Sequence, residues 1–178
     1  AKLDFIDVTV QAWAAESGAV DRSYAVKASE AVFRELYNEK TNTIALLRPD
    51  LGPEHWDGTL KNPPEWAGGA AEYPDDVRET GQYTHAIGFF ISGLLKLGLG
   101  DAALKAMKTT LPTVHSQREG YGAEPYAMAA DIQGKTGKAG WSWYSGAAGW
   151  VLRGATEGML GIDFRDGNKL FVDPTLPT

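Results

Sequence analysis

An almost uniformly apolar stretch from Tyr83 to Leu99 constrains the fold of this chain more than any other feature. Its apolar side chains would lie on every side of a helix: Ile87, Phe89, Phe90, Ile91, Leu94, Leu95 and Leu97. A helix that is apolar all round has to be surrounded by other elements, so we expect it in the core. Gly98 and Gly100 should end it. The run is too short and too rich in glycine for a membrane span.

More helices are expected before this core helix. Residues 5–16 have the mixed apolar pattern of a buried helix that ends near Gly18, although their β-branched members also allow a strand. Asp21 is a suitable N-cap for a second helix, which should end near Asn38. An apolar stripe supports this helix and consists of Ala25, Ala28, Val32 and Leu36. Residues 43–47 fit either a short strand or a final turn.

The second half of the chain should continue as short helices and end in strands. We expect Asp101 to cap a helix over 102–110 that Pro112 stops, and a short helix over 124–132. A connection rich in Gly and Lys (134–140) then leads to a helix over 145–160, which Gly161 ends. Alternation over 162–172 around Asp166-Gly167 predicts a β-hairpin.

This order of elements predicts a mainly α fold, a toroid of antiparallel helix pairs with a small β-hairpin tail. The 178 residues suffice for one core. We therefore expect a single domain, with a toroid segment over 1–160 that includes a long proline-rich loop (48–80) and a tail over 161–178. A complete barrel of six helix hairpins needs about twelve helices, roughly twice what this length supplies. The chain is then either a smaller helical domain or part of a larger one.

Charge and composition restrict the partners. The net charge of −6 argues against nucleic acid, because broad phosphate binding needs clusters of Lys and Arg. The chain has no Cys, and His55 and His115 have no partners at metal-ligand spacing, so we expect no metal. No signal peptide is visible after Ala1, and we expect no direct insertion of this segment into a membrane.

Two positions suit an anion. Ser145 and Gly146 open a predicted helix, whose first N–H groups are unpaired and whose end carries a positive partial charge. The alternative is that Ser145 is only an N-cap and that Gly146 begins a close helix contact. His85 precedes the core helix and could donate a hydrogen bond to phosphate or to a sugar hydroxyl. Its alternative role is that of a hydrogen-bonded core histidine.

Other residues suit a sugar. Trp141, Trp143 and Tyr144 offer flat apolar faces for stacking on sugar rings, although core packing is the alternative for such aromatic residues. Arg78, Glu79 and Glu124 could bind sugar hydroxyls or phosphate, or could form surface salt bridges. The adjacent residues Asp75 and Asp76 could be considered as a pair for acid–base catalysis. Neighbouring residues rarely face each other across a scissile bond, so we interpret the pair as loop acids.

The motifs become informative when they are taken together. The segments are Arg-Glu-Thr-Gly-Gln-Tyr-Thr-His-Ala (78–86), Tyr-Gly-Ala-Glu-Pro-Tyr-Ala-Met-Ala-Ala-Asp (121–131) and Gly-Trp-Ser-Trp-Tyr-Ser-Gly-Ala-Ala-Gly-Trp (140–150). In this order they resemble the C-terminal part of glycoside hydrolase family 94, which includes cellobiose and chitobiose phosphorylases. The resemblance is greatest to the phosphorylase-like domain of cyclic β-1,2-glucan synthases of the NdvB type. It extends over nearly the whole chain, since residues 11–19 and the tail from Gly161 to Pro174 fit the same pattern.

The resemblance implies a fold and a reaction. The fold would be the C-terminal half of an (α/α)6 barrel. The reaction would be inverting phosphorolysis of a β-glucoside, or its reverse, with inorganic phosphate as co-substrate and no further cofactor. An Asp general acid would protonate the glycosidic oxygen while phosphate attacks the anomeric carbon from the other face.

The resemblance also assigns residues. Phosphate would be bound by His85, Ser145 and Gly146. The substrate-binding set would be Arg78, Glu79, Gln82, Tyr83, Glu124, Trp141 and Trp143. No catalytic residue is expected here, because the family's general acid belongs to a Trp-Asn-Asp segment, which we expect upstream of this chain.

Two departures and several wider expectations accompany the resemblance. The segment around Glu79 is one residue shorter than the family's Arg-Glu-Asn-Gly-Gly-Gln-Tyr-Thr-His, and Ser145 replaces the usual Thr.

The expected partners are a β-glucan oligosaccharide, phosphate and the remainder of a parent polypeptide. We expect a cytoplasmic location, at the inner membrane through other domains of the parent, and no activity of this chain alone. The alternatives are a non-catalytic sugar-binding or structural module and a six-hairpin glycoside hydrolase.

Overall fold

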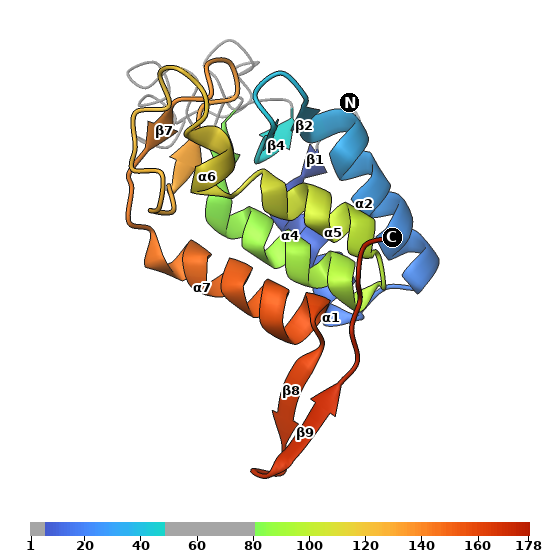
Figure 1. The fold of residues 1–178 in the computed structure, drawn as a ribbon. Coiled ribbons are helices and arrows are strands. Elements are labelled where there is room, and N and C mark those ends of the chain that lie inside the picture. The colour runs from blue at the N-terminus through green and yellow to red at the C-terminus, as the bar shows by residue number, and fades with distance from the viewer. Residues whose placement is uncertain (1–5, 49–80) are drawn as a thin grey trace, which may run out of the picture.

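The computed structural model describes residues 6–48 and 81–178 and is mainly α-helical, as predicted (Figure 1). The α-helices are α1 (Val8–Ser17), α2 (Arg22–Leu36), α4 (Thr84–Lys96), α5 (Gly100–Lys108), α6 (Pro112–His115) and α7 (Ser145–Arg153). A π-helical segment, η3 (Gly154–Met159), continues α7. The expected loop over 48–80 lies outside the described residues except for Arg48. The half-barrel arrangement stays a prediction.

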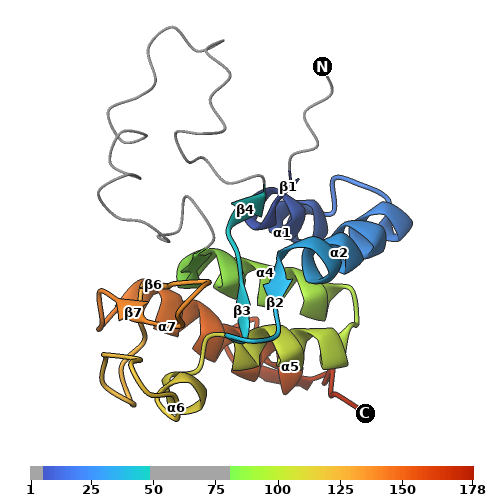
Figure 2. The same ribbon diagram turned by 90° about the horizontal axis from the view of Figure 1, so that it is seen from above.

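Helix α4 is the centre of the core, as its apolar sequence predicts. Phe90, Ile91 and Leu94 have no exposed surface, and the helix packs against α1, α5 and α7. Figure 2 shows α1 and α2 along one edge and α7 along the opposite edge, with α4 between them. Two glycines permit this close packing. A Cβ added at Gly88 would lie 2.7 Å from the Cβ of Trp150, and one at Gly93 would lie 2.8 Å from the Cβ of Ala15.

Short antiparallel strands connect the helices. The sheets pair β1 (Ile6–Asp7) with β4 (Leu47–Arg48), β2 (Tyr37–Asn38) with β3 (Thr43–Ile44), and β5 (Gln82–Tyr83) with β6 (Asp131–Ile132) and β7 (Ala139–Gly140). The strand alternative for residues 43–47 is therefore confirmed. The sheet β5–β6–β7 ties the start of α4 to the segment that precedes α7, which is the arrangement that positions the candidate site.

The first two helices form where the sequence predicts them. Helix α1 starts at Val8 because the carboxylate of Asp7 accepts hydrogen bonds from the backbone N–H of Thr9 (2.7 Å) and Val10 (3.4 Å). It ends at Gly18, whose φ of 67° is the left-handed conformation that glycine adopts without strain. Asp21 occupies the N-cap position of α2, but its side chain makes no capping hydrogen bond.

Two predictions about the middle of the chain are wrong. Residues 124–132 do not form a helix, because strand pairing uses their backbone groups: the N–H of Thr84 donates to the carbonyl of Ala130, and the N–H of Ala130 donates to Trp141. Asp101 lies inside α5 rather than at its N-cap, since the helix already begins at Gly100. The Asp101 carboxylate instead accepts hydrogen bonds from the backbone N–H and the hydroxyl of Thr178.

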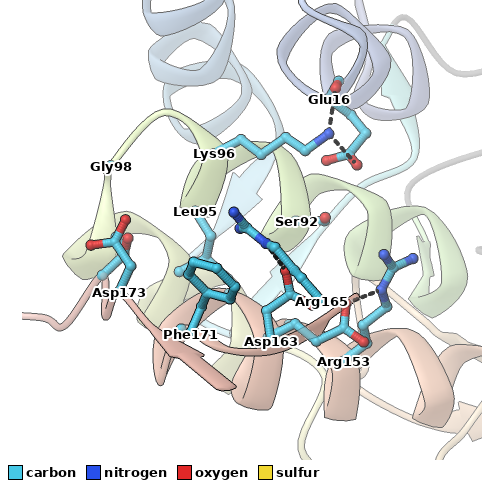
Figure 3. A pocket seen from close by; sticks show the side chains of 15 residues that line it. Glu16, Ser92, Leu95, Lys96, Gly98, Arg153, Asp163, Arg165, Phe171 and Asp173 are labelled. Atoms are coloured by element: carbon cyan, nitrogen blue, oxygen red, sulfur yellow. Dashed lines mark hydrogen bonds and ion pairs between the residues drawn. The ribbon is translucent and has the colours of Figure 1, made fainter. Parts of the chain in front are cut away.

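The hairpin at the end of the chain is confirmed. Strands β8 (Ile162–Arg165) and β9 (Lys169–Val172) pair in antiparallel fashion, and Asp166 and Gly167 both have positive φ in the turn between them. In Figure 1 the hairpin projects away from the helices. It borders a groove of about 550 Å³ beside α4 and η3. The cations that line this groove are paired with acids: Lys96 with Glu16, Arg153 with Glu157 and Arg165 with Asp163 (Figure 3).

Candidate functional site

The structure brings together the residues predicted to bind phosphate. Ser145 and Gly146 form the first turn of α7, and His85 lies in the first turn of α4. A Cβ added at Gly146 would lie 3.2 Å from Cε1 of the His85 ring, so the imidazole lies directly against the helix N-terminus. Helix starts and an imidazole N–H both suit an anion, so the arrangement can bind one from two sides.

Among the described residues, the backbone N–H groups at the start of α7 have no acceptor within the helix. Tyr144, not Ser145, occupies the N-cap position, and no side chain caps this end of the helix. The first intrahelical bond runs from the N–H of Ala148 to the carbonyl of Tyr144 at 3.2 Å, which leaves the preceding N–H groups without an intrahelical acceptor. Ser145 and Gly146 are exposed. The N-cap alternative for Ser145 is therefore not what the structure shows.

Aromatic rings enclose His85. The ring centroid of Tyr83 is 6.1 Å from that of His85, that of Tyr144 is 5.7 Å away, and that of Phe89 is 4.8 Å away. His85 is half-buried, and among the described residues its ring nitrogens have no hydrogen-bond partner. In the described part of the chain, the ring is thus held by packing, and no described residue occupies its nitrogens.

The hydroxyl groups of Tyr83 and Tyr144 are 2.6 Å apart and share a hydrogen bond. This bond, followed by burial, raises the pKa of Tyr83 to about 12. The Tyr83 hydroxyl therefore stays protonated at neutral pH. Since one Tyr precedes α4 and the other precedes α7, the bond joins the two elements that carry the anion-binding groups.

Exposed aromatic residues lie in the same part of the chain. Trp141 is 84% exposed and Trp143 is 66% exposed. Both have positive φ, at 50° and 65°, which is strained for a large side chain and is typical of functional loops. Tyr126 is 73% exposed and meets Trp143 edge to face at 5.9 Å between ring centroids. Core packing is thus excluded for these three rings, which offer apolar faces to a sugar.

Glu124 supports the Trp143 ring. The indole N–H of Trp143 donates to Oε1 of Glu124 at 3.3 Å. Attraction from the backbone amide of Glu124 itself and from the hydroxyl of Ser142 lowers the pKa of this carboxyl, and Trp143 adds to the effect. Glu124 is therefore ionised at neutral pH and can accept hydrogen bonds from sugar hydroxyls.

The remaining predicted residues are placed differently. Gln82 is fully buried: its side-chain oxygen accepts from the N–H of Ile44 at 2.8 Å, and its amide nitrogen donates to the carbonyl of Thr109 at 2.6 Å. Through these bonds Gln82 connects the segment of Ile44 to that of Thr109. Arg78 and Glu79 lie outside the described residues. Tyr126, an exposed ring next to Trp143, was not among the residues predicted to bind sugar, although the Glu-Pro-Tyr motif contains it.

Only one of the other two histidines is among the described residues. His115 is buried, and His55 lies outside the described residues. In the part of the chain that the structure describes, no three His, Asp or Glu side chains gather as metal ligands would. No helix among residues 6–48 and 81–178 is long and apolar enough to cross a membrane.

This chain belongs to the glycosyl hydrolase 94 superfamily, since residues 4–161 match the family's catalytic domain. It is also 36% identical to the cyclic beta-(1,2)-glucan synthase NdvB of Rhizobium meliloti (strain 1021). That alignment covers 97% of this chain and 6% of the relative, so the chain spans a small part of that protein's length. Membership places the segment in a carbohydrate-active, glycoside phosphorylase-like class, as its motifs predict.

Proposed function

We propose that this segment provides phosphate-binding and sugar-binding groups to an enzyme that makes or cleaves β-glucosidic bonds by inverting phosphorolysis. The observation that carries the proposal is the contact between His85 and Gly146 at the start of α7. It combines an imidazole, a hydroxyl at Ser145 and free backbone N–H groups around one point. Membership of a carbohydrate-active, glycoside phosphorylase-like family supports the proposed reaction.

The proposed roles follow from the chemistry of phosphate. A dianion next to the helix N-terminus would accept hydrogen bonds from the backbone N–H groups and from Ser145 Oγ. His85 would donate from one ring nitrogen. Such charge-assisted hydrogen bonds contribute about 1.5–3 kcal/mol each, so two or three of them suffice for millimolar to micromolar binding.

The sugar would lie on the exposed rings. Trp141, Trp143 and Tyr126 offer stacking faces, and the Glu124 carboxylate can accept hydrogen bonds from adjacent hydroxyls. In the proposed reaction, phosphate oxygen attacks the anomeric carbon while an acid outside this segment protonates the departing glycosidic oxygen. The bond to phosphate forms as the glycosidic bond breaks, and the configuration inverts.

Phosphate titration tests the proposal. We expect inorganic phosphate to shift the backbone N–H signals of Ser145 and Gly146 in NMR spectra of this chain, with saturation. His85→Asn should weaken binding about tenfold, which corresponds to the loss of about 1.4 kcal/mol. Ser145→Ala should weaken it less, since only the hydroxyl is lost. Sulfate should compete, whereas chloride at equal ionic strength should not.

His115, the second histidine among the described residues, provides a matched control. His115 is buried in a different cluster, so His115→Gln should leave phosphate binding unchanged while altering stability. The proposal fails if phosphate leaves the α7 signals unmoved. It also fails if both histidine variants change the affinity equally.

A sugar-binding segment without phosphate chemistry is the second candidate. It is favoured by the exposure of Trp141 and Trp143, which a phosphate site does not need. Calorimetry with a linear β-1,2-gluco-oligosaccharide separates the two functions. The second candidate requires binding that Trp143→Ala abolishes, that Ser145→Ala leaves intact and that phosphate does not affect.

The proposal has consequences for partners. Inorganic phosphate would be the co-substrate, with no organic cofactor and no metal. A β-glucan and the remainder of a longer polypeptide would be the partners, and nucleic acid would not be one. We place the reaction in the cytoplasm, with any attachment to the inner membrane made by other parts of that polypeptide.

A further inference from the structure

We propose that Tyr83 and Tyr144 form a positioning pair, whose shared hydrogen bond holds the His85 imidazole at the N-terminus of α7. The pair would act through His85 and need not touch phosphate itself. This inference rests on the proposed function for its effect on phosphate. Its structural part concerns only the placement of His85 and can be tested without any ligand.

The place of each Tyr in the chain makes such a role possible. Tyr83 ends β5 and immediately precedes α4, the helix that carries His85. Tyr144 is the N-cap residue of α7, immediately before Ser145. The hydroxyl–hydroxyl distance of 2.6 Å is short and joins two residues that are 61 positions apart in the sequence. The sheet β5–β6–β7 also connects their segments.

The two rings also form the walls around His85. Tyr144 meets the imidazole edge to face at 5.7 Å, and Tyr83 is tilted against it at 6.1 Å. Phe89 lies behind the ring at 4.8 Å. The described residues provide no hydrogen bond to the imidazole nitrogens. Among these residues, ring packing and the Gly146 backbone therefore orient the imidazole, and the hydroxyl bond joins two of the three rings around it.

The bond persists over a wide pH range. Hydrogen bonding and burial raise the pKa of Tyr83 to about 12, so the pair keeps its proton well above neutral pH. Backbone hydrogen bonds beside the sheet support the same geometry. The N–H of Tyr144 donates to the carbonyl of Met128 at 2.8 Å, and the N–H of Thr84 donates to the carbonyl of Ala130 at 2.9 Å. The hydroxyl bond therefore joins side chains whose backbones are already anchored.

Removing either hydroxyl tests the inference. Tyr83→Phe and Tyr144→Phe keep both rings but break the bond. In ¹H–¹³C NMR spectra without phosphate, we expect the His85 ring signals to shift and the contact between His85 Hε1 and the Gly146 Hα protons to weaken. With phosphate, each variant should bind about fivefold more weakly, the equivalent of one ordinary hydrogen bond.

The double variant distinguishes a pair from two separate packing residues. Since either single change already breaks the bond, Tyr83→Phe/Tyr144→Phe should be no worse than one single variant, whereas independent effects would multiply. Tyr37→Phe is the matched control. Its hydroxyl also makes a partly buried bond, to Asn42 at 3.2 Å, but away from His85. This control should lose stability without moving the His85 signals.

The outcomes separate the two proposals. Unchanged His85 signals in Tyr83→Phe and Tyr144→Phe, or multiplicative losses in the double variant, would overturn the positioning pair. If the chain binds no phosphate but the His85 signals shift as expected, the pair stands and the proposed function fails. If phosphate binds and the His85 signals do not move in the variants, the proposed function stands and the positioning pair fails.

Discussion

The backbone of Gly146 lies so close to the imidazole of His85 that a Cβ at this position would approach Cε1 to 3.2 Å. Real side chains rarely pack this tightly, so the neighbour would have to shift. The contact joins the first turn of α7 to the first turn of α4. A side chain at position 146 would therefore require the His85 imidazole to move by a few tenths of an ångström, away from the helix N–H groups.

Gly146→Ala should weaken phosphate binding about tenfold, a loss of about 1.4 kcal/mol, because the methyl group displaces His85 and covers the helix N-terminus. The matched control is Gly149→Ala on the same helix, where an added Cβ meets nothing within 4 Å. This control should stabilise the protein by about 0.5–1 kcal/mol, since Ala is the better helix former. Phosphate titration and urea unfolding measure the two effects; equal phosphate affinities of the two variants would contradict the expectation.

Glu124 should control the orientation of the Trp143 ring. Because the pKa of Glu124 is lowered, the carboxylate should persist below pH 4.5, the ordinary value for Glu. The indole N–H signal of Trp143 should therefore titrate with a midpoint below pH 4.5, and Glu124→Gln should remove this titration. Trp143→Phe identifies the signal. Glu124→Ala should reduce oligosaccharide affinity more than Glu124→Gln, which keeps an acceptor oxygen. A Trp143 signal that does not respond to Glu124 would be inconsistent with this role.

Two glycines of α4 should separate stability from function. Gly88→Ala and Gly93→Ala both overpack the core, against Trp150 and Ala15, and each should cost about 1–3 kcal/mol of unfolding free energy. Trp150 belongs to α7, so only Gly88→Ala should push this helix away from His85 and weaken phosphate binding. Chemical unfolding gives the free energy of unfolding of each variant, and phosphate titration of the same samples gives its phosphate affinity. Equal loss of phosphate affinity in both variants would show that general destabilisation is responsible.

His115 should make stability depend on pH. Burial, opposed by its bond to the Thr109 carbonyl, lowers the pKa of His115 below 6.5, and Arg118 lowers it further. Well above pH 6.5, His115 is neutral in the folded and the unfolded protein, so its titration does not change the free energy of unfolding. As the pH falls below 6.5, the unfolded chain gains a proton that the folded chain does not. Stability should then drop by at most about 1.4 kcal/mol per pH unit until the folded pKa is reached.

His115→Gln is the test of this linkage. The Gln amide can still donate to the Thr109 carbonyl, but it does not titrate. Urea unfolding between pH 5 and 8 should therefore give a flatter stability profile for the variant than for the parent chain. Parallel profiles would assign the pH dependence to other groups.

Much of the helical framework follows from local patterns. The all-round apolar run that became α4, the one-sided stripe of α2, and the Asp166-Gly167 turn each have a local physical cause, and all were predictable. The region 124–132 was not, because its backbone hydrogen bonds go to β5 and to Trp141, partners distant in sequence. Pro125 would lie in the first turn of such a helix, where proline is tolerated, so the local sequence did not exclude a helix.

Motifs name candidate site residues, whose binding roles stay predictions, but they do not give the geometry of the site. Motifs identified His85 and Gly146, yet only packing shows that they are in contact. Gln82 belongs to the same motif as His85 but is fully buried, a difference that depends on Ile44 and Thr109 from other segments. Tyr126 shows the opposite error, since its exposure depends on the turn that replaced the expected helix.

Helix α4 carries His85 at its first turn and is buried on nearly every side by α1, α5 and α7. A ligand that binds beside His85 thus meets groups that are already ordered in the free protein. Little conformational entropy remains to be lost on association. More of the free energy of a few hydrogen bonds can then appear as affinity, and this segment would act as a preorganised part of a larger enzyme's binding site.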